Sequence, residues 1–285
     1  MEKSSYLVDV HWLFEHLDAT NVVIIDTRFS LAQPRQGYEQ YQTGHIPGAY
    51  YLDLNQDLSS SVQTHGGRHP LPNWNAFVNK LNQLGIYSDS PIGPTQIVIY
   101  DDSRFAFAAR LWWMLRYLGH EQVAILNGGI QAWQSAGFAL SKEMPKQKMG
   151  NFVAQPQNDW IVDIETVRRG QGKPDITIVD SRSPERWRGE VEPIDPVAGS
   201  IPTSVNSFWQ NISTEDGQLK SADDLSSYWS RLDLQPETIV YCGSGVTACV
   251  NLFSLAIAGH PMYKLYPGGW SDWCSYLTED VADAN

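Results

Sequence analysis

VVIIDTR at residues 22–28 returns as ITIVDSR at residues 176–182. Each copy is a run of β-branched residues that ends in an aspartate, a hydroxyl residue and an arginine, which is typical of a buried strand followed by a turn. Further along, GHIPGA at 44–49 is matched by GSIPTS at 199–204. The first offset is 154 residues and the second is 155, a period far too long for a solenoid repeat. The sequence therefore predicts one domain that is present twice.

Two further landmarks follow in the same order in both halves. The run IVIY at 97–100 is matched by TIVY at 238–241, and each is followed by a polar loop and then an apolar run. A Gly-Gly pair occurs next at 128–129 and again at 268–269. Because four landmarks keep one order with slowly drifting offsets, we interpret the chain as an internal duplication.

A polar stretch, residues 141–159, lies between the two copies and contains two prolines and no apolar periodicity. Such a composition is typical of a linker. We therefore predict an amino-terminal domain over residues 1–145, a linker over 146–159 and a carboxy-terminal domain over 160–285.

Within each half, short β-branched runs alternate with helical patterns such as residues 104–118 and 246–258. Strand–helix alternation with short loops predicts an α/β fold in which each domain has a parallel central sheet flanked by helices. In such sheets ligands bind at the carboxyl ends of the strands, where a helix begins. That rule points to two loops, the one after Tyr100 and the one after Tyr241.

The 285 residues are 42% hydrophobic and 18% charged, which is typical of globular proteins. Lysine and arginine number 20 against 32 acidic residues, so the net charge of −12 argues against nucleic acid or an anionic membrane as a partner. No apolar run reaches the ~18 residues of a membrane span, and the first residues lack a secretory or transit pattern. The three cysteines, Cys242, Cys249 and Cys274, fit neither a disulfide framework nor a zinc site. We therefore predict a cytoplasmic protein with no metal site.

The loop after Tyr241 reads CGSGVTA at residues 242–248 and leads directly into a predicted helix. Its small residues allow the backbone to curl so that several N–H groups face the Cys242 sulfur, and the helix adds the positive end of its dipole. Both effects lower the pKa of a thiol from about 8.5 towards the ~3.5–7.5 range of activated cysteines. A buried structural cysteine is the alternative, but a packed cysteine does not need two neighbouring glycines. We therefore predict that Cys242 is a reactive thiolate.

The corresponding loop of the first half has Asp101 in the place of Cys242. Phe105 and Phe107 stand there in place of the glycine turn. A carboxylate cannot act as a thiolate nucleophile, and the ring of N–H groups need not form around it. We therefore predict that the amino-terminal domain is inactive.

Two other cysteine chemistries use a similar architecture. Cysteine-dependent phosphatases and arsenate reductases need an arginine six residues after the cysteine, to hold the oxyanion with two hydrogen bonds. Ala248 occupies that position, and no lysine or arginine lies between residues 242 and 263. A Cys-His hydrolase stays open as an alternative, although no motif ties a histidine to Cys242.

CGSGVTA resembles the active-site loop of the tandem-domain rhodanese family, in particular its 3-mercaptopyruvate sulfurtransferase branch. VIIDTR, IVDSR, GHIPGA and the Gly-Gly pairs agree with that resemblance, which covers essentially the whole chain. It implies two rhodanese-like domains, of which only the second is catalytic. It also implies a sulfurtransferase in which the Cys242 thiolate takes a sulfane sulfur from a small anionic donor, becomes a persulfide and passes that sulfur to a cyanide, thiol or thioredoxin-like acceptor. No metal or organic cofactor is implied.

The resemblance also implies where the donor binds. The family holds the donor anion with an arginine after the DSR strand, and Arg186 occupies the matching place. The 3-mercaptopyruvate branch usually has a second arginine after a Glu-Pro pair, but here Glu192-Pro193 is followed by Ile194. The remaining predicted contacts to the donor come from the loop itself: Gly243, Ser244, Gly245, Val246 and Thr247.

A loop without cationic side chains favours 3-mercaptopyruvate, a singly charged carboxylate, over the dianion thiosulfate. Thiosulfate as the main donor stays open as an alternative, as does a non-catalytic module that only carries persulfide.

Further side chains are candidates for supporting roles. Arg68 and Arg104 could supply the missing positive charge, and His45, together with Ser244, could handle protons; His45 is equally well explained as a turn residue. Arg28 and Arg182, each two residues after a strand aspartate, are expected to pair with carboxylates and stabilise the fold.

Overall fold

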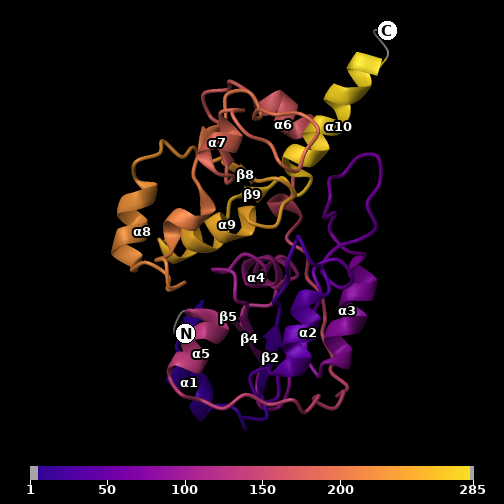
Figure 1. Ribbon diagram of the computed structural model, residues 1–285, viewed down its shortest axis with the longest axis vertical. Coiled ribbons are helices and arrows are strands. Elements are labelled where there is room, and N and C mark those ends of the chain that lie inside the picture. Colours follow the sequence, from indigo (N-terminus) through magenta and orange to yellow (C-terminus); the bar gives the residue numbers. More distant parts are fainter. Residues whose placement is uncertain (1–5, 283–285) are drawn as a thin grey trace. The chain divides into compact units, whose positions relative to one another are not determined.

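The computed structural model describes residues 6–282, which form two compact units (Figure 1). The first consists of residues up to Ser59 with 72–157 and 215–219, and the second of residues 60–71, 158–214 and those from Lys220 onward. Two loops therefore belong to the unit opposite to the one that their place in the sequence predicts. The backbone N–H groups of Gly66 and Arg68 donate to Asp272 and Ser271, and that of Leu219 donates to Asn127. Sequence periodicity cannot reveal such docking, because it depends on tertiary hydrogen bonds.

The first unit is built around a five-stranded parallel sheet with the strand order β1-β5-β4-β2-β3. Its elements are β1 Leu7–Val8, α1 Val10–Glu15, β2 Val22–Asp26, α2 Gln36–Thr43, β3 Tyr50–Tyr51, α3 Trp74–Gln83, β4 Gln96–Tyr100, α4 Ala108–Tyr117, β5 Val123–Leu126 and α5 Gly129–Ser135. In Figure 1, α1 and α5 lie to the left of the strands, and α2 and α3 lie to the right. The sheet is thus flanked by helices, as the alternating pattern predicts.

The second unit repeats this arrangement with a four-stranded parallel sheet of order β7-β6-β8-β9. Its elements are a 3₁₀ turn Asn158–Trp160, α6 Ile164–Gly170, β6 Ile178–Asp180, α7 Pro184–Trp187, β7 Val205–Asn206, a 3₁₀ turn Trp209–Ile212, α8 Ala222–Trp229, β8 Ile239–Tyr241, α9 Ala248–Ile257, β9 Lys264–Leu265 and α10 Gly269–Ala282. A bridge from Ile161 to Leu265 stands where β1 pairs with β5 in the first unit. The predicted α/β fold class and its duplication are therefore confirmed.

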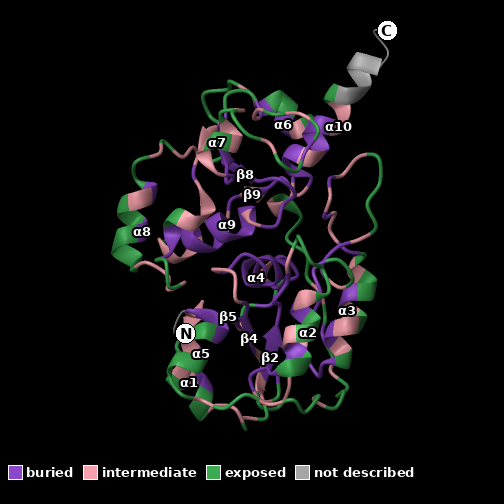
Figure 2. Ribbon diagram, in the orientation of Figure 1, coloured by how far each residue is buried: buried purple, intermediate pink, exposed green. Residues whose placement is uncertain are grey.

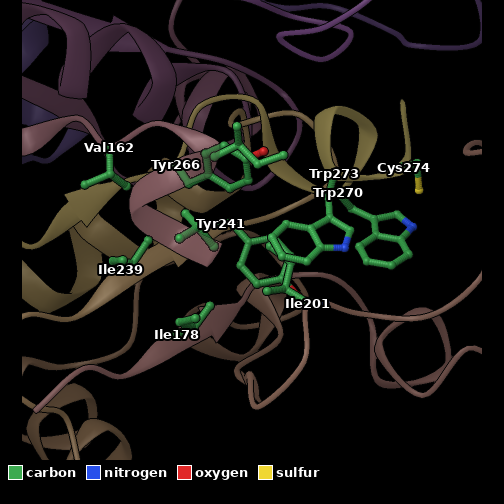
Figure 3. Close-up of a cluster of buried hydrophobic side chains, with 11 residues drawn as sticks. Val162, Ile178, Ile201, Ile239, Tyr241, Tyr266, Trp270, Trp273 and Cys274 are labelled. Atoms are coloured by element: carbon green, nitrogen blue, oxygen red, sulfur yellow. The ribbon is translucent and has the colours of Figure 1, made fainter. Parts of the chain in front are cut away.

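Each unit has its own hydrophobic core. In the second unit, Ile178, Ile239 and Tyr241 of the strands pack with Trp270 and Trp273 of α10, as Figure 3 shows. The central strands β2, β4, β5, β6 and β8 are buried over most of their length, and so are the helices α4 and α9, each of which follows a strand-end loop (Figure 2). Within the described part of the chain, no helix is long and apolar enough to cross a membrane.

Matched ion pairs support both cores. Arg28 donates to both oxygens of Asp26, and Arg182 does the same to Asp180, with shortest N···O distances of 2.6 and 2.7 Å. All four side chains are buried. The expected pairing of both arginines with carboxylates is therefore confirmed.

Candidate active site

Cys242 lies directly after β8 and six residues before α9, with 2% of its surface exposed. Its carbonyl accepts the Trp270 N–H at 2.8 Å, and the carbonyl of Asp101 accepts the equivalent Ile130 N–H at 3.1 Å. Thr247 is the N-cap residue of α9, so the positive end of the helix faces the loop. The structure thus places Cys242 at the carboxyl end of a central strand, where the sequence predicts it.

Two glycines are required by the course of this loop. Gly245 has a φ of +72°, and a Cβ there would lie 2.4 Å from the Pro267 carbonyl oxygen. A Cβ on Gly243 would lie 2.9 Å from Nη2 of Arg68 and 3.7 Å from Nη2 of Arg186. Gly243 therefore leaves the space in which two guanidinium groups approach the residue next to Cys242.

Arg68 and Arg186 come from different parts of the second unit and meet at Gly243. Arg186, in α7, is the anion anchor that the family resemblance implies. Arg68 belongs to the segment 60–71, which joins this unit only through tertiary contacts. Burial lowers the pKa of Arg68. Arg68 thus brings a second guanidinium to the loop, although Ile194 stands where the family usually has its second arginine.

Carboxylates hold both guanidinium groups. Arg186 donates to Glu192 at 2.7 and 3.1 Å and to Asp195 at 3.2 Å, while Arg68 forms an ion pair with the other oxygen of Asp195. Glu192 also accepts from Arg182 at 3.1 Å. The result is a continuous network of three arginines and three carboxylates, counting the Asp180 that pairs with Arg182. Because the three positive and three negative formal charges cancel, this network places guanidinium N–H donors beside the Cys242 loop without adding net charge to the site.

A histidine and a serine form a hydrogen-bonded pair beside the cysteine. Nδ1 of His69 lies 2.7 Å from Oγ of Ser244, and both side chains are buried. The sequence analysis did not identify His69. The run GGRHPLP at 66–72 could have indicated it, because an arginine and a histidine stand there among turn residues. The other histidine considered, His45, lies in the first unit and is fully buried, with its ring nitrogens 2.8 and 3.1 Å from the carbonyls of Tyr41 and Glu143. It supports the backbone there.

The last two predicted loop residues, Val246 and Thr247, lead directly into α9. The carbonyls of Val246 and Thr247 each accept a backbone N–H three residues on, from Cys249 and Val250, at 3.1 Å. A donor contact of either residue stays a prediction, as does a ring of N–H groups around the Cys242 sulfur.

The other two cysteines are buried, and neither forms a disulfide. The Cys249 thiol donates to the Gly245 carbonyl at 3.3 Å, and the Cys274 thiol lies 3.6 Å from the Val197 carbonyl. Burial raises the pKa of Cys274 to about 11. A thiol with such a pKa is almost entirely protonated near neutral pH, so Cys274 is a poor nucleophile there.

The loop of the first unit corrects one expectation. A ring of N–H groups does form around Asp101: its carboxylate accepts from the backbone N–H groups of Ser103, Phe105, Phe107 and Ala108 at 2.9 to 3.2 Å. Arg104 and Phe105 adopt positive φ angles of 56° and 74°, so the chain curls without glycine. For the same reason α4 begins at Ala108 instead of residue 104.

The first-unit loop opens onto a cavity of about 430 Å³ whose lining includes Asp101, Arg104 and residues 215–218. The structure therefore places Arg104 in a pocket of the first unit. A carboxylate has no sulfur and cannot act as a thiolate nucleophile, in keeping with the predicted inactivity of this loop.

Comparisons with known proteins agree with this architecture. A model of the rhodanese-like domain matches residues 9–136 and again residues 163–276. The chain is 41% identical over 285 residues to the "Probable 3-mercaptopyruvate sulfurtransferase" of Pseudomonas aeruginosa, with 98% of each chain covered. It is 31% identical to the rat thiosulfate sulfurtransferase, covering 94% of this chain and 91% of that one.

Among solved structures, the crystal structure of SseA from Escherichia coli, a 3-mercaptopyruvate sulfurtransferase, superimposes with a TM-score of 0.81 at 34% identity. That superposition covers 94% of this chain and 99% of SseA. The duplicated parallel sheets, the cysteine loop of the second unit and these similarities lead to one conclusion: the chain belongs to the rhodanese family and carries one rhodanese-like domain in each half.

Proposed function

We propose that this protein is a sulfurtransferase that moves a sulfane sulfur from 3-mercaptopyruvate to an acceptor through a persulfide on Cys242. The observation that carries the proposal is the convergence of Arg68 and Arg186 on Gly243, beside the cysteine. Two guanidinium groups provide directed donors for the donor carboxylate, and the adjacent loop provides the nucleophile. Relatives with the names of sulfurtransferases cover nearly the whole chain, which supports the same activity.

The reaction proceeds in two balanced steps. In the first, the Cys242 thiolate attacks the donor sulfur, an S–S bond forms and the C–S bond breaks. The electron pair passes to the former donor carbon, which takes up the proton of the donor thiol, so pyruvate leaves and a persulfide anion stays on Cys242. In the second step, a nucleophile such as cyanide or a thiolate attacks the outer sulfur, and Cys242 leaves again as a thiolate.

The site provides groups for each demand of the first step. Arg186 and Arg68 hold the donor carboxylate, and the positive end of α9 favours the thiolate and the persulfide anion. The Ser244–His69 pair lies beside the nucleophile and carries the proton from sulfur to carbon. Val246, Thr247 and the loop glycines contribute backbone N–H groups around the sulfur, as the filled ring around Asp101 illustrates for the sister loop.

The second candidate donor is thiosulfate, and the arginine pair is the observation that favours it, because two guanidinium groups also suit a dianion. Against it stands the balance of the network, in which Glu192 and Asp195 neutralise that charge. A singly charged carboxylate fits this balance better than a dianion does. We also propose a thiol, cyanide or thioredoxin-like acceptor, and a cytoplasmic location, which suits three cysteines that form no disulfide.

Intact-mass measurement after incubation with 3-mercaptopyruvate tests the proposal directly. We expect one added sulfur atom per chain, which peptide mapping locates on Cys242 and which cyanide removes as thiocyanate. In parallel, kcat/KM for 3-mercaptopyruvate should exceed that for thiosulfate. A large preference for thiosulfate would show that thiosulfate, and not 3-mercaptopyruvate, is the main donor. A persulfide that forms without turnover would favour the non-catalytic module that only carries persulfide.

Replacing Ser244 with alanine should separate the two donors. With 3-mercaptopyruvate a proton must move from sulfur to carbon, so loss of the Ser244–His69 relay is expected to lower kcat about 10²-fold. With thiosulfate the leaving group is the sulfite dianion and no proton moves, so kcat should change by less than about threefold. Steady-state kinetics with both donors measure this, with His69→Gln as a second variant. Equal losses with both donors would contradict the relay.

A further inference from the structure

Asp195 is a buried carboxylate placed between the two arginines of the site. Its side chain is 2% exposed, and each of its oxygens faces a different guanidinium group: Oδ1 pairs with Arg68 and Oδ2 accepts from Arg186 at 3.2 Å. We propose that Asp195 is a built-in counter-anion and positioning residue that sets the charge of the sulfur donor which the site accepts. This inference rests on the proposed function, because it concerns the donor of the same reaction.

The geometry assigns this role to Asp195 and a different one to Glu192. Glu192 accepts from Arg182 and Arg186 and also from the backbone N–H groups of Ile194 and Asp195, at 3.0 and 3.1 Å, so it fixes the local fold. Asp195 instead links the two arginine side chains that face Gly243. Because Arg68 comes from the segment 60–71, this carboxylate also ties that segment to the donor site.

Charge determines the consequence for specificity. With Asp195 present, the arginines and carboxylates of the network cancel, and an incoming anion meets directed N–H donors but no net positive charge. Without it, the network carries one uncompensated positive charge. The electrostatic free energy of binding is proportional to the charge of the ligand, so the change in binding free energy is twice as large for a dianion as for a monoanion. The factor by which the affinity rises for a dianion is therefore the square of the factor for a monoanion. Asp195 therefore selects against dianionic donors such as thiosulfate.

The test replaces Asp195 with asparagine, which keeps the shape and removes the charge. We expect KM to fall about tenfold for 3-mercaptopyruvate and about 100-fold for thiosulfate, so that the ratio of kcat/KM for thiosulfate to that for 3-mercaptopyruvate rises about tenfold. Asp195→Glu should restore a ratio near that of the wild type. Glu190→Gln is the matched control, because Glu190 forms an exposed pair with Arg188 in the same stretch of chain and its loss should leave the ratio unchanged.

A binding measurement separates this inference from the proposed function. In a Cys242→Ser background, which removes the chemistry, calorimetry compares pyruvate as a monoanion with sulfate as a dianion. We expect Asp195→Asn to tighten sulfate more than pyruvate, whether or not the parent protein transfers sulfur. If both anions bind more weakly, or if the ratio of the two affinities does not move, Asp195 has only a structural role and the inference is wrong.

Discussion

Replacing Cys242 with serine is expected to lower sulfur transfer by at least about 10⁴-fold with either donor, the largest effect on activity that we predict. A serine hydroxyl is not ionised near neutral pH and cannot hold a sulfane sulfur as a persulfide. The surrounding loop should survive the change, because its path is set by Gly245 and by the hydrogen bond from Trp270 to the carbonyl of residue 242. Steady-state rates with cyanide as acceptor measure the loss.

The chain itself offers matched controls for this experiment. Cys249→Ser and Cys274→Ser replace the other two thiols, which lie in the same unit and are buried. Both variants should keep the activity within about threefold of the wild type in the folded protein and should still gain one sulfur in the mass measurement. A Cys242→Ser protein that still acquires a labile sulfur and passes it to cyanide would show that another residue carries the reaction.

The fold could be predicted because each buried strand can be recognised from its own local sequence. Buried parallel strands need runs of apolar β-branched residues, and the same runs occur at equal places in the two halves, so periodicity alone indicated the duplication. The loops were less predictable. Arg104 and Phe105 interrupt the helical pattern of residues 104–118 because both adopt positive φ angles, in a turn whose N–H groups are accepted by the Asp101 carboxylate. A local pattern does not reveal that turn.

The candidate site likewise contains residues that the sequence could predict and residues that it could not. Cys242 and Arg186 could be named because each follows directly after a strand or turn whose sequence is characteristic. Arg68 and His69 reach the site through the docking of segment 60–71 on residues 271 and 272, which rests on side-chain hydrogen bonds far apart in the sequence. Asp195 was not identifiable at all, since its significance depends on the two arginines that its oxygens contact.

The duplicated Asp–Arg pairs allow structural and functional effects to be separated, and they carry our second large prediction. Arg182→Met removes the partner of the buried Asp180 and one partner of Glu192, which should cost about 3–5 kcal/mol in the free energy of unfolding. Arg28→Met removes the partner of Asp26 in the sister unit and should cost a similar amount. Urea unfolding measures both, and hydrogen exchange should locate the loss in the second unit for Arg182 and in the first for Arg28.

The two variants should differ in the kinetics of the folded protein. Without Arg182, Glu192 is left with Arg186 as its guanidinium partner, and the network loses one positive charge, so KM for 3-mercaptopyruvate should rise about three- to tenfold. Arg28 lies in the unit whose loop holds Asp101, and its loss should leave KM within about twofold. Equal KM values in the two variants would mean that the ion pair of Arg182 only stabilises the fold and does not affect binding of the donor. A rise confined to Arg182→Met, opposite in sign to the fall expected for Asp195→Asn, would show that the same chain of charges tunes the anion site in both directions.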